Sequence, residues 1–284
     1  MMLYSSPSRP TELKIVSFFA LLFFSFASFS MSSDSVKIEM QTTKGTMKIV
    51  LYPETPLHQE NFINLVKSKF YNGVVFHRVI KDFMAQAGDP NSKDSLYVGT
   101  LGNTSEGETI PSEILPIYHH KKGALCAARK GDNMNPTKAS SGSQFYIVQG
   151  RKFTSAQLKN MEARINAQNA GKQLNVFLQL KENNIYLEQL KKFQKQKKKD
   201  SINFLIETIK PLANKNLEQF EFSEKAVNDY LTIGGTPHLD GGYTVFGEVI
   251  KGLEIIDEIC NAQIGSSDRP KEDIKIISVQ LIDK

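Results

Sequence analysis

Apolar and polar residues alternate in short stretches along this 284-residue chain. The alternation runs through residues 36–51 on either side of a polar turn at 43–46. A period of two places one set of side chains on one face of a strand, so this segment predicts a β-hairpin. A helix is expected next, capped by Thr55, with an apolar face made of Leu57, Phe62, Leu65 and Val66.

The stretch from Val74 to Asp89 carries an arginine, Arg78, at a position that the apolar pattern assigns to a buried face. Read as a strand, it places Arg78 on the same face as Phe76 and Ile80. A guanidinium in such a row is costly to bury unless it is paired or faces a cleft. Two apolar side chains and an amide follow at Phe83, Met84 and Gln86. A cation beside apolar surface with an amide at its rim suits a neutral, kinked, amide-bearing ligand, and a prolyl peptide fits that description.

Near Gly150 the pattern changes from short strands to helical spacing. Residues 153–231 carry almost no Gly and predict two or three amphipathic helices. Strand character returns at Gly234, after earlier short strands at 123–128 and 144–148. The sequence therefore predicts a mainly β domain over residues 32–284, a closed barrel capped by helices, interrupted by an α-helical insertion at 151–232.

The insertion carries a cluster of lysines between Lys191 and Lys199. We expect a solvated helix face or helix end. Binding to an anionic membrane surface or to an acidic partner is the alternative.

Residues 1–31 differ from the rest. Arg9 and Lys14 precede an apolar run at 15–29, and small residues follow. This arrangement predicts a signal peptide and export to the periplasm, while an uncleaved N-terminal anchor would make the protein membrane-associated. A true start at Met31 is a further alternative.

Composition narrows the range of partners. The chain is 40% hydrophobic and 23% charged, with a net charge of +5, which is too weak a bias to predict nucleic-acid binding. Cys126 and Cys260 are expected to be small buried hydrophobes, with a disulfide between them as the alternative. His119 and His120 are adjacent, which favours a turn over a metal site, and no other spacing predicts a metal or a cofactor.

Four segments in order resemble the cyclophilin family of peptidyl-prolyl isomerases. They are 76–80 with 83–89, 123–125 with 128–129, 143–147, and 239–241 with 245–249. The resemblance covers about 36–150 and 233–284. It implies a closed eight-stranded antiparallel barrel capped by two helices, and an isomerase without cofactor or metal. It also implies proline-containing peptides and unfolded protein clients as partners, a role in folding exported proteins, and action as a monomer.

The resemblance also assigns roles to residues. Arg78 would donate a hydrogen bond to the prolyl nitrogen as the amide twists, and Gln86 would orient Arg78 and hold the substrate backbone. The implied substrate-binding residues are Phe83, Met84, Ala128, Arg129, Gln144, Tyr146, His238, Leu239 and Tyr243.

Several positions depart from the best-known eukaryotic members. His238 stands where they carry a Trp that contributes to cyclosporin binding, so weak affinity for that drug is expected. Tyr243 replaces a His, and Tyr146 replaces a pocket Phe. Arg129 and Lys130 replace small or neutral residues and would favour acidic residues in the substrate, or would be exposed without a role.

Two other functions remain open from the sequence. The chain could be a non-catalytic cyclophilin-like chaperone or binding scaffold that uses the helical insertion to hold clients. It could also be a membrane-tethered adaptor. The insertion itself is either such an arm or a passive helical subdomain.

Overall fold

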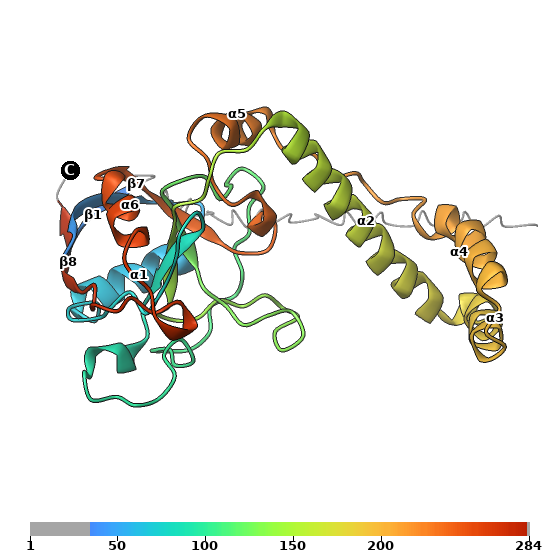
Figure 1. Cartoon of the computed structure of the whole chain (residues 1–284), viewed down its shortest axis with the longest axis horizontal. Helices are drawn as coiled ribbons and strands as arrows, with labels where there is room; N and C mark the ends of the chain where they lie inside the picture. The colour runs from blue at the N-terminus through green and yellow to red at the C-terminus, as the bar shows by residue number, and fades with distance from the viewer. Residues whose placement is uncertain (1–34, 283–284) are drawn as a thin grey trace, which may run out of the picture. The chain divides into compact units, whose positions relative to one another are not determined.

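The computed structural model describes residues 35–282, so the predicted segment 1–31 lies outside the described residues. Eight strands form one antiparallel sheet in the order β3-β4-β6-β5-β7-β2-β1-β8. Figure 1 shows the sheet together with the helices. Their bounds are β1 Val36–Thr42, β2 Gly45–Leu51, β3 Arg78–Ile80, β4 Met84–Ala87, β5 Ala124–Ala127, β6 Phe145–Val148, β7 Val245–Lys251 and β8 Ile276–Ile282. The predictions of a mainly β fold with eight antiparallel strands and of the first hairpin are confirmed.

All eight strands contribute side chains to one apolar core, so the sheet curls around it. The predicted closure is wrong, because no ladder joins the edge strands β3 and β8. Only backbone hydrogen bonds between 73–76 and 274–276 connect the two edges, such as Phe76 N to Ile274 O at 2.9 Å. β3 has three residues, too few to present the backbone groups that a complete ladder requires.

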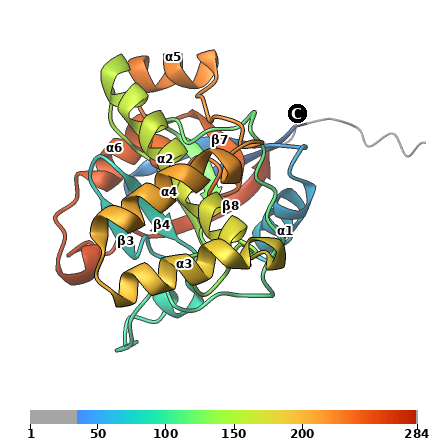
Figure 2. The ribbon, with the colours of Figure 1, turned by 90° about the vertical axis from the view of Figure 1, so that its right-hand side faces the viewer.

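Two helices, α1 (Pro56–Lys67) and α6 (Glu254–Cys260), bury side chains in the same core from different sides of the strands (Figure 2). The predicted cap of α1 is wrong, since the Thr55 hydroxyl donates to the carbonyl of Tyr52 instead. The carboxylate of Glu113 accepts from the backbone N–H groups of Leu57 and His58, each at 3.0 Å. An acid from a distant loop thus stabilises the positive end of the helix, and Leu57, predicted to be buried, is 46% exposed.

The strand predicted over 74–80 is interrupted, and this changes which side chains share a face. Phe76 and Val79 both point into the core, whereas Ile80 packs against a second cluster on the other face of the sheet. Phe76 and His77 lie outside the strands of the sheet, and this accounts for the shift, because a residue outside the ladder can reset the alternation. Arg78 and Ile80 are therefore both turned out of the core and share a face as predicted, whereas the prediction that Phe76 lies on that face is wrong.

The insertion contains four α-helices rather than the predicted two or three. They are α2 Ser155–Gln179, α3 Asn184–Lys195, α4 Lys199–Ala213 and α5 Glu224–Thr232. The remaining short 3-10 helices of the described residues are η1 Pro90–Lys93, η2 Lys181–Asn183, η3 Pro237–Leu239 and η4 Ser266–Asp268. A capping box between Thr154 and Gln157 starts α2.

Each end of α2 belongs to a separate apolar cluster. α5 packs near its N-terminal end, where Leu158 joins Phe222 and Tyr230. α3 and α4 pack near its C-terminal end, where Leu178 joins Ile209 (Figure 1). Twenty residues separate Leu158 from Leu178, or about 30 Å at 1.5 Å per residue. The second cluster therefore forms its own small core.

The lysines between Lys191 and Lys199 are all exposed, as the solvated-face prediction requires. Cys126 and Cys260 are both buried and unpaired, as predicted for small hydrophobes. Within residues 35–282, no helix combines the length and apolar character that crossing a membrane requires.

Candidate functional site

A pocket of about 100 Å³ opens on the face of the sheet opposite the main core. Its lining residues are Arg78, Phe83, Met84, Gln86, Ala128, Arg129, Tyr146, Leu239 and Tyr243. All nine are among the eleven site residues predicted from the sequence. The other two, Gln144 and His238, contact lining residues, as described below.

Strand register explains why the polar and apolar groups meet. Arg78 on β3 lies directly opposite Gln86 on β4, and Gln86 lies opposite Tyr146 on β6. Side chains paired across neighbouring antiparallel strands share a face and lie within contact distance. Met84 is two residues before Gln86 and therefore points the same way. Three strands thus present a guanidinium, an amide and a ring in one row.

The apolar wall of the pocket is made of residues that precede the insertion in the sequence and of residues that follow it. Met84 and Tyr146 are buried, and Phe83, Leu239 and Tyr243 pack against them. The exposed ring of His238 stacks on Phe83, with centroids 5.4 Å apart and an interplanar angle of 27°. His238 therefore extends this wall at the rim, where sequence comparison placed a Trp in other family members.

Arg78 is partly exposed and has one acidic neighbour. Its Nε lies 3.4 Å from Oδ2 of Asp268, and the two side chains are 43% and 39% exposed. An ion pair this long and this exposed is weak, so it orients the guanidinium without neutralising it. Asp268 lies in η4 with φ of 58°. Sequence reasoning missed this residue because 190 positions separate it from Arg78 and no local pattern marks it.

Two glutamines fix each other beside Arg78. Gln86 Nε2 donates to Oε1 of Gln144 at 2.9 Å. Gln144 Nε2 donates in turn to the carbonyls of Gly102 and Thr104, at 3.0 and 2.6 Å. Among the hydrogen bonds of residues 35–282, none joins Gln86 to Arg78. No hydrogen bond therefore supports the predicted orienting role of Gln86, and the guanidinium has the weak ion pair with Asp268 instead.

Arg129 is held within the chain. Its Nε donates to the Gly242 carbonyl at 2.7 Å, it pairs with Asp132 at 2.8 Å, and its guanidinium carbon lies 4.5 Å from the ring centre of Tyr243. The hydrogen bond from Arg129 to the carboxylate of Asp132 lowers the pKa of Asp132. Because this charge is already paired, the expected preference for acidic residues in the substrate depends on the exposed Lys130.

His77 is buried directly beside Arg78. Neither of its ring nitrogens has a hydrogen-bond partner among the described residues, and the side chain is neutral because burial lowers its pKa to about 4. A neutral ring adds no charge next to the guanidinium. The two ring nitrogens without partners lower the free energy of unfolding. The ring is therefore held in place by packing and not by hydrogen bonds.

His119 and His120, predicted as turn residues, are buried in a polar network behind the pocket. His119 Nε2 lies 2.8 Å from Oδ2 of Asp229, and His120 Nε2 lies 3.0 Å from the hydroxyl of Tyr146. Burial lowers the pKa of His119, although its bond to Asp229 opposes this shift. Sequence reasoning missed Asp229 and Tyr230. The partner of Asp229, His119, lies 110 residues away, and the partner of Tyr230, Asp240, lies beyond η3.

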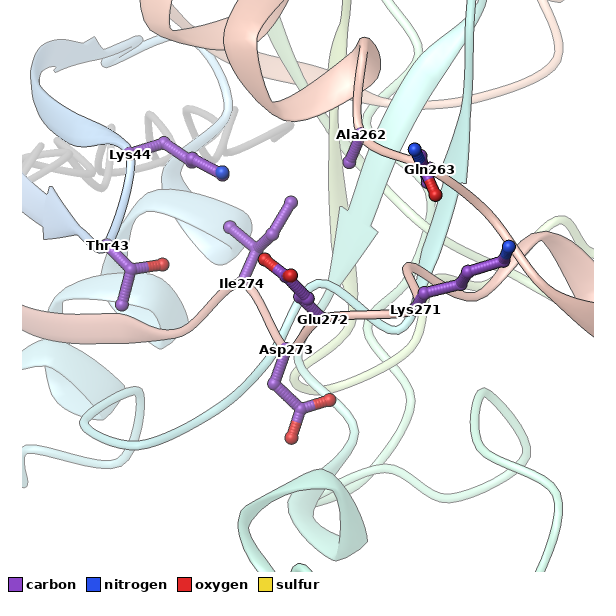
Figure 3. A pocket seen from close by; sticks show the side chains of 8 residues that line it. All are labelled: Thr43, Lys44, Ala262, Gln263, Lys271, Glu272, Asp273 and Ile274. Carbon is purple, nitrogen blue, oxygen red and sulfur yellow. The ribbon is translucent and has the colours of Figure 1, made fainter.

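A second hollow, shown in Figure 3, shares no lining residue with this pocket. It is lined by Thr43, Lys44, Ala262, Gln263, Lys271, Glu272, Asp273 and Ile274. Its charged residues are exposed, and none of its lining side chains has a buried polar atom without a partner. It offers no group that needs a ligand, so the Arg78 pocket is the candidate site.

Comparison with known families agrees with this geometry. The family model described as cyclophilin type peptidyl-prolyl cis-trans isomerase/CLD matches residues 36–211 and 194–281. The chain belongs to the cyclophilin family. The prediction of a peptidyl-prolyl cis-trans isomerase is thereby confirmed. The two matches overlap within the insertion, at residues 194–211.

Individual relatives show the extent of the likeness. A Staphylococcus saprophyticus protein assigned by name as a peptidyl-prolyl cis-trans isomerase is 29% identical over 89% of this chain and 94% of its own length. A Streptococcus pyogenes protein assigned as a bifunctional phosphatase and isomerase is 28% identical, and the chain spans only 39% of its length. A cyclophilin-type isomerase structure from Cryptosporidium parvum has a TM-score of 0.53 and 19% identity, covering 88% of this chain and 99% of its own. That structure supports the fold.

The buried, neutral His77 predicts a pH dependence of stability. Between its ordinary pKa of 6.5 and about 4, the unfolded chain binds a proton that the folded chain does not. The free energy of unfolding should therefore fall as pH decreases through this window, by on the order of 2 kcal/mol from this residue. Urea denaturation at pH 7 and pH 4.5 measures the change, and in His77→Gln it should be smaller. Equal changes in the two proteins, or an NMR titration of His77 near pH 6.5, would contradict this prediction.

Proposed function

We propose that this cyclophilin accelerates rotation about X-Pro bonds by stabilising the twisted amide with Arg78. The observation that supports the proposal is the position of the guanidinium at the rim of an apolar pocket walled by Phe83, Met84 and Leu239. The pocket would take the proline ring. The guanidinium would then lie beside the bond that rotates.

Rotation about an X-Pro bond requires few other groups from the protein. Rotation about a peptide bond crosses a barrier of about 18–20 kcal/mol because the twist breaks amide resonance. The prolyl nitrogen becomes more basic as resonance is lost, so a hydrogen-bond donor binds the twisted amide more tightly than the planar one. Selective binding of the transition state is what lowers a barrier. A guanidinium is a permanent cation in proteins and has several donors, so the mechanism needs no proton transfer from Arg78.

The glutamine pair would hold the peptide on either side of the proline. Gln144 holds the amide nitrogen of Gln86, which leaves the Gln86 carbonyl oxygen free to accept from a substrate N–H. A related Cryptosporidium parvum structure, with a TM-score of 0.51, was determined in the presence of the dipeptide Ala-Pro. This supports proline-containing peptides as substrates of the present chain.

Replacing Arg78 tests the mechanism. Arg78→Ala should lower kcat/KM for a cis-to-trans proline peptide by about 10²–10³, the loss expected for one transition-state donor. Arg78→Lys keeps the charge but loses the planar fork and should lie in between. Arg164→Ala removes an exposed arginine of α2 and serves as the control. Equal rates for wild type and Arg78→Ala would falsify the proposed role.

We also propose that the protein acts on exported clients, either in the periplasm or at the membrane. The support is the basic, then apolar, then small-residue order of residues 1–31. Cell fractionation with N-terminal sequencing of the mature chain tests this. An N-terminus near residue 31 in a soluble extracytoplasmic fraction is expected, and an intact anchor would appear in the membrane fraction. Recovery in the cytoplasm would contradict the proposal.

The insertion supports a second candidate role, the holding of unfolded clients. Large apolar side chains of α2, α3 and α4 are exposed, including Val176 at 53%, Ile185 at 64% and Phe204 at 76%. The exposed lysines lie in α3, at the start of α4 and in the link between these two helices. Apolar surface of this kind binds unfolded chains, and the charges keep the surface soluble.

Replacing exposed side chains separates holding from catalysis. The double variant Ile185→Ser, Phe204→Ser should leave isomerisation of a short peptide unchanged and weaken assistance to the refolding of a whole protein by at least about tenfold, since the two lost apolar contacts contribute roughly 1 kcal/mol each. Ile277→Ser, on β8 and 49% exposed, is the matched control. If refolding assistance is the same in all three proteins, the insertion holds no clients through this surface.

A further inference from the structure

A continuous hydrogen-bonded chain runs from the insertion to the proline pocket. Nε2 of His120 lies 3.0 Å from the Tyr146 hydroxyl, and Nδ1 of His120 lies 2.7 Å from Oδ1 of Asp240. The other carboxylate oxygen of Asp240 accepts from the hydroxyl of Tyr230, which belongs to α5. The side chains of His120 and Asp240 are only 1% and 9% exposed, so water does not replace these bonds freely.

The direction of each hydrogen bond follows from its partners. A carboxylate only accepts, so Nδ1 of His120 carries its hydrogen toward Asp240. Nε2 then makes the second hydrogen bond of the ring, with the Tyr146 hydroxyl. Burial raises the pKa of both Tyr146 and Tyr230, so both keep their hydroxyl hydrogens at neutral pH. Each group therefore fixes the orientation of the next.

This chain determines where the Tyr146 hydroxyl points. Tyr146 lines the pocket but its hydroxyl is bound to His120, which does not line it. A buried hydroxyl without a partner costs roughly 1–3 kcal/mol, so Tyr146 would turn to find another partner if His120 moved. The ring also packs edge-on against Tyr243, with centroids 5.9 Å apart. A rotation of Tyr146 would therefore change the pocket shape as well as its polarity.

α5 is anchored at the start of this chain by two consecutive residues. Tyr230 is fully buried and packs against Phe153 and Phe222. Asp229 binds His119, the neighbour of His120. The insertion thus contacts both histidines, one directly and the other through Asp240.

We propose that α5 is a positioning element of the proline pocket, in which the Tyr230 hydroxyl orients Asp240, Asp240 orients His120, and His120 holds the Tyr146 hydroxyl away from the bound proline ring. Tyr230 acts through other residues and does not touch substrate. The inference rests on the proposed isomerase function. It gives the insertion a role in catalysis that is separate from any binding of clients.

A double-mutant cycle tests this chain. Tyr230→Phe removes one hydroxyl and should lower kcat/KM for a proline peptide about fivefold, chiefly through a higher KM. In a Tyr146→Phe background the same change should have less than a twofold effect, because the hydroxyl that the chain holds is already absent. Tyr186→Phe, in the distant cluster of the insertion, should leave the rate unchanged. Urea unfolding of each variant measures the stability change separately.

The outcomes separate this inference from the function on which it rests. A wild type without activity would refute the isomerase proposal itself. An active wild type with equal losses from Tyr230→Phe in both backgrounds would overturn the positioning chain and leave the isomerase proposal intact. The absence of any effect of Tyr230→Phe in the wild-type background would overturn it as well.

Discussion

An unpaired guanidinium cannot be buried in an apolar core, and the arrangement of the site follows from that constraint. Phe76 and Val79 both point into the core. The shift in alternation between them turns Arg78 to the opposite face of the sheet, where its side chain remains 43% exposed. β4 and β6 then add Gln86 and Tyr146 in register beside it. The break before β3, at Phe76 and His77, thus places a charged donor at the rim of an apolar pocket.

The same short β3 leaves the sheet open at its edge. Residues 73–76 connect to 274–276 by a few backbone hydrogen bonds. η4 lies shortly before 274–276 in the sequence and brings Asp268 close to Arg78. The acid that orients the guanidinium therefore comes from the segment that borders this open edge. The insertion supports the other side of the pocket, since α5 binds Asp240 immediately after Leu239.

The sequence allowed much of this to be predicted, and its failures have a common cause. The strands, the insertion and the residues around Arg78 carry local patterns, and the structure brings those residues together. Glu113, which caps α1, and Asp268 lie far in sequence from their partners and carry no local signal. The prediction that Thr55 caps α1 was wrong because the first N–H groups of the helix donate to the carboxylate of Glu113, which lies far away in the sequence. Closure of the barrel was wrong because family resemblance does not specify how many residues of an edge strand will pair.

The proposed role of Arg78 requires that it stabilise the twisted amide more than it stabilises bound peptide. An NMR exchange titration with a peptide containing Ala-Pro reports both quantities in one sample. Wild type should bind the peptide and exchange its cis and trans signals, whereas Arg78→Ala should bind with an affinity within about threefold and lose the exchange at least about a hundredfold. Persistent exchange in Arg78→Ala, or a loss of exchange fully explained by lost binding, would contradict the account.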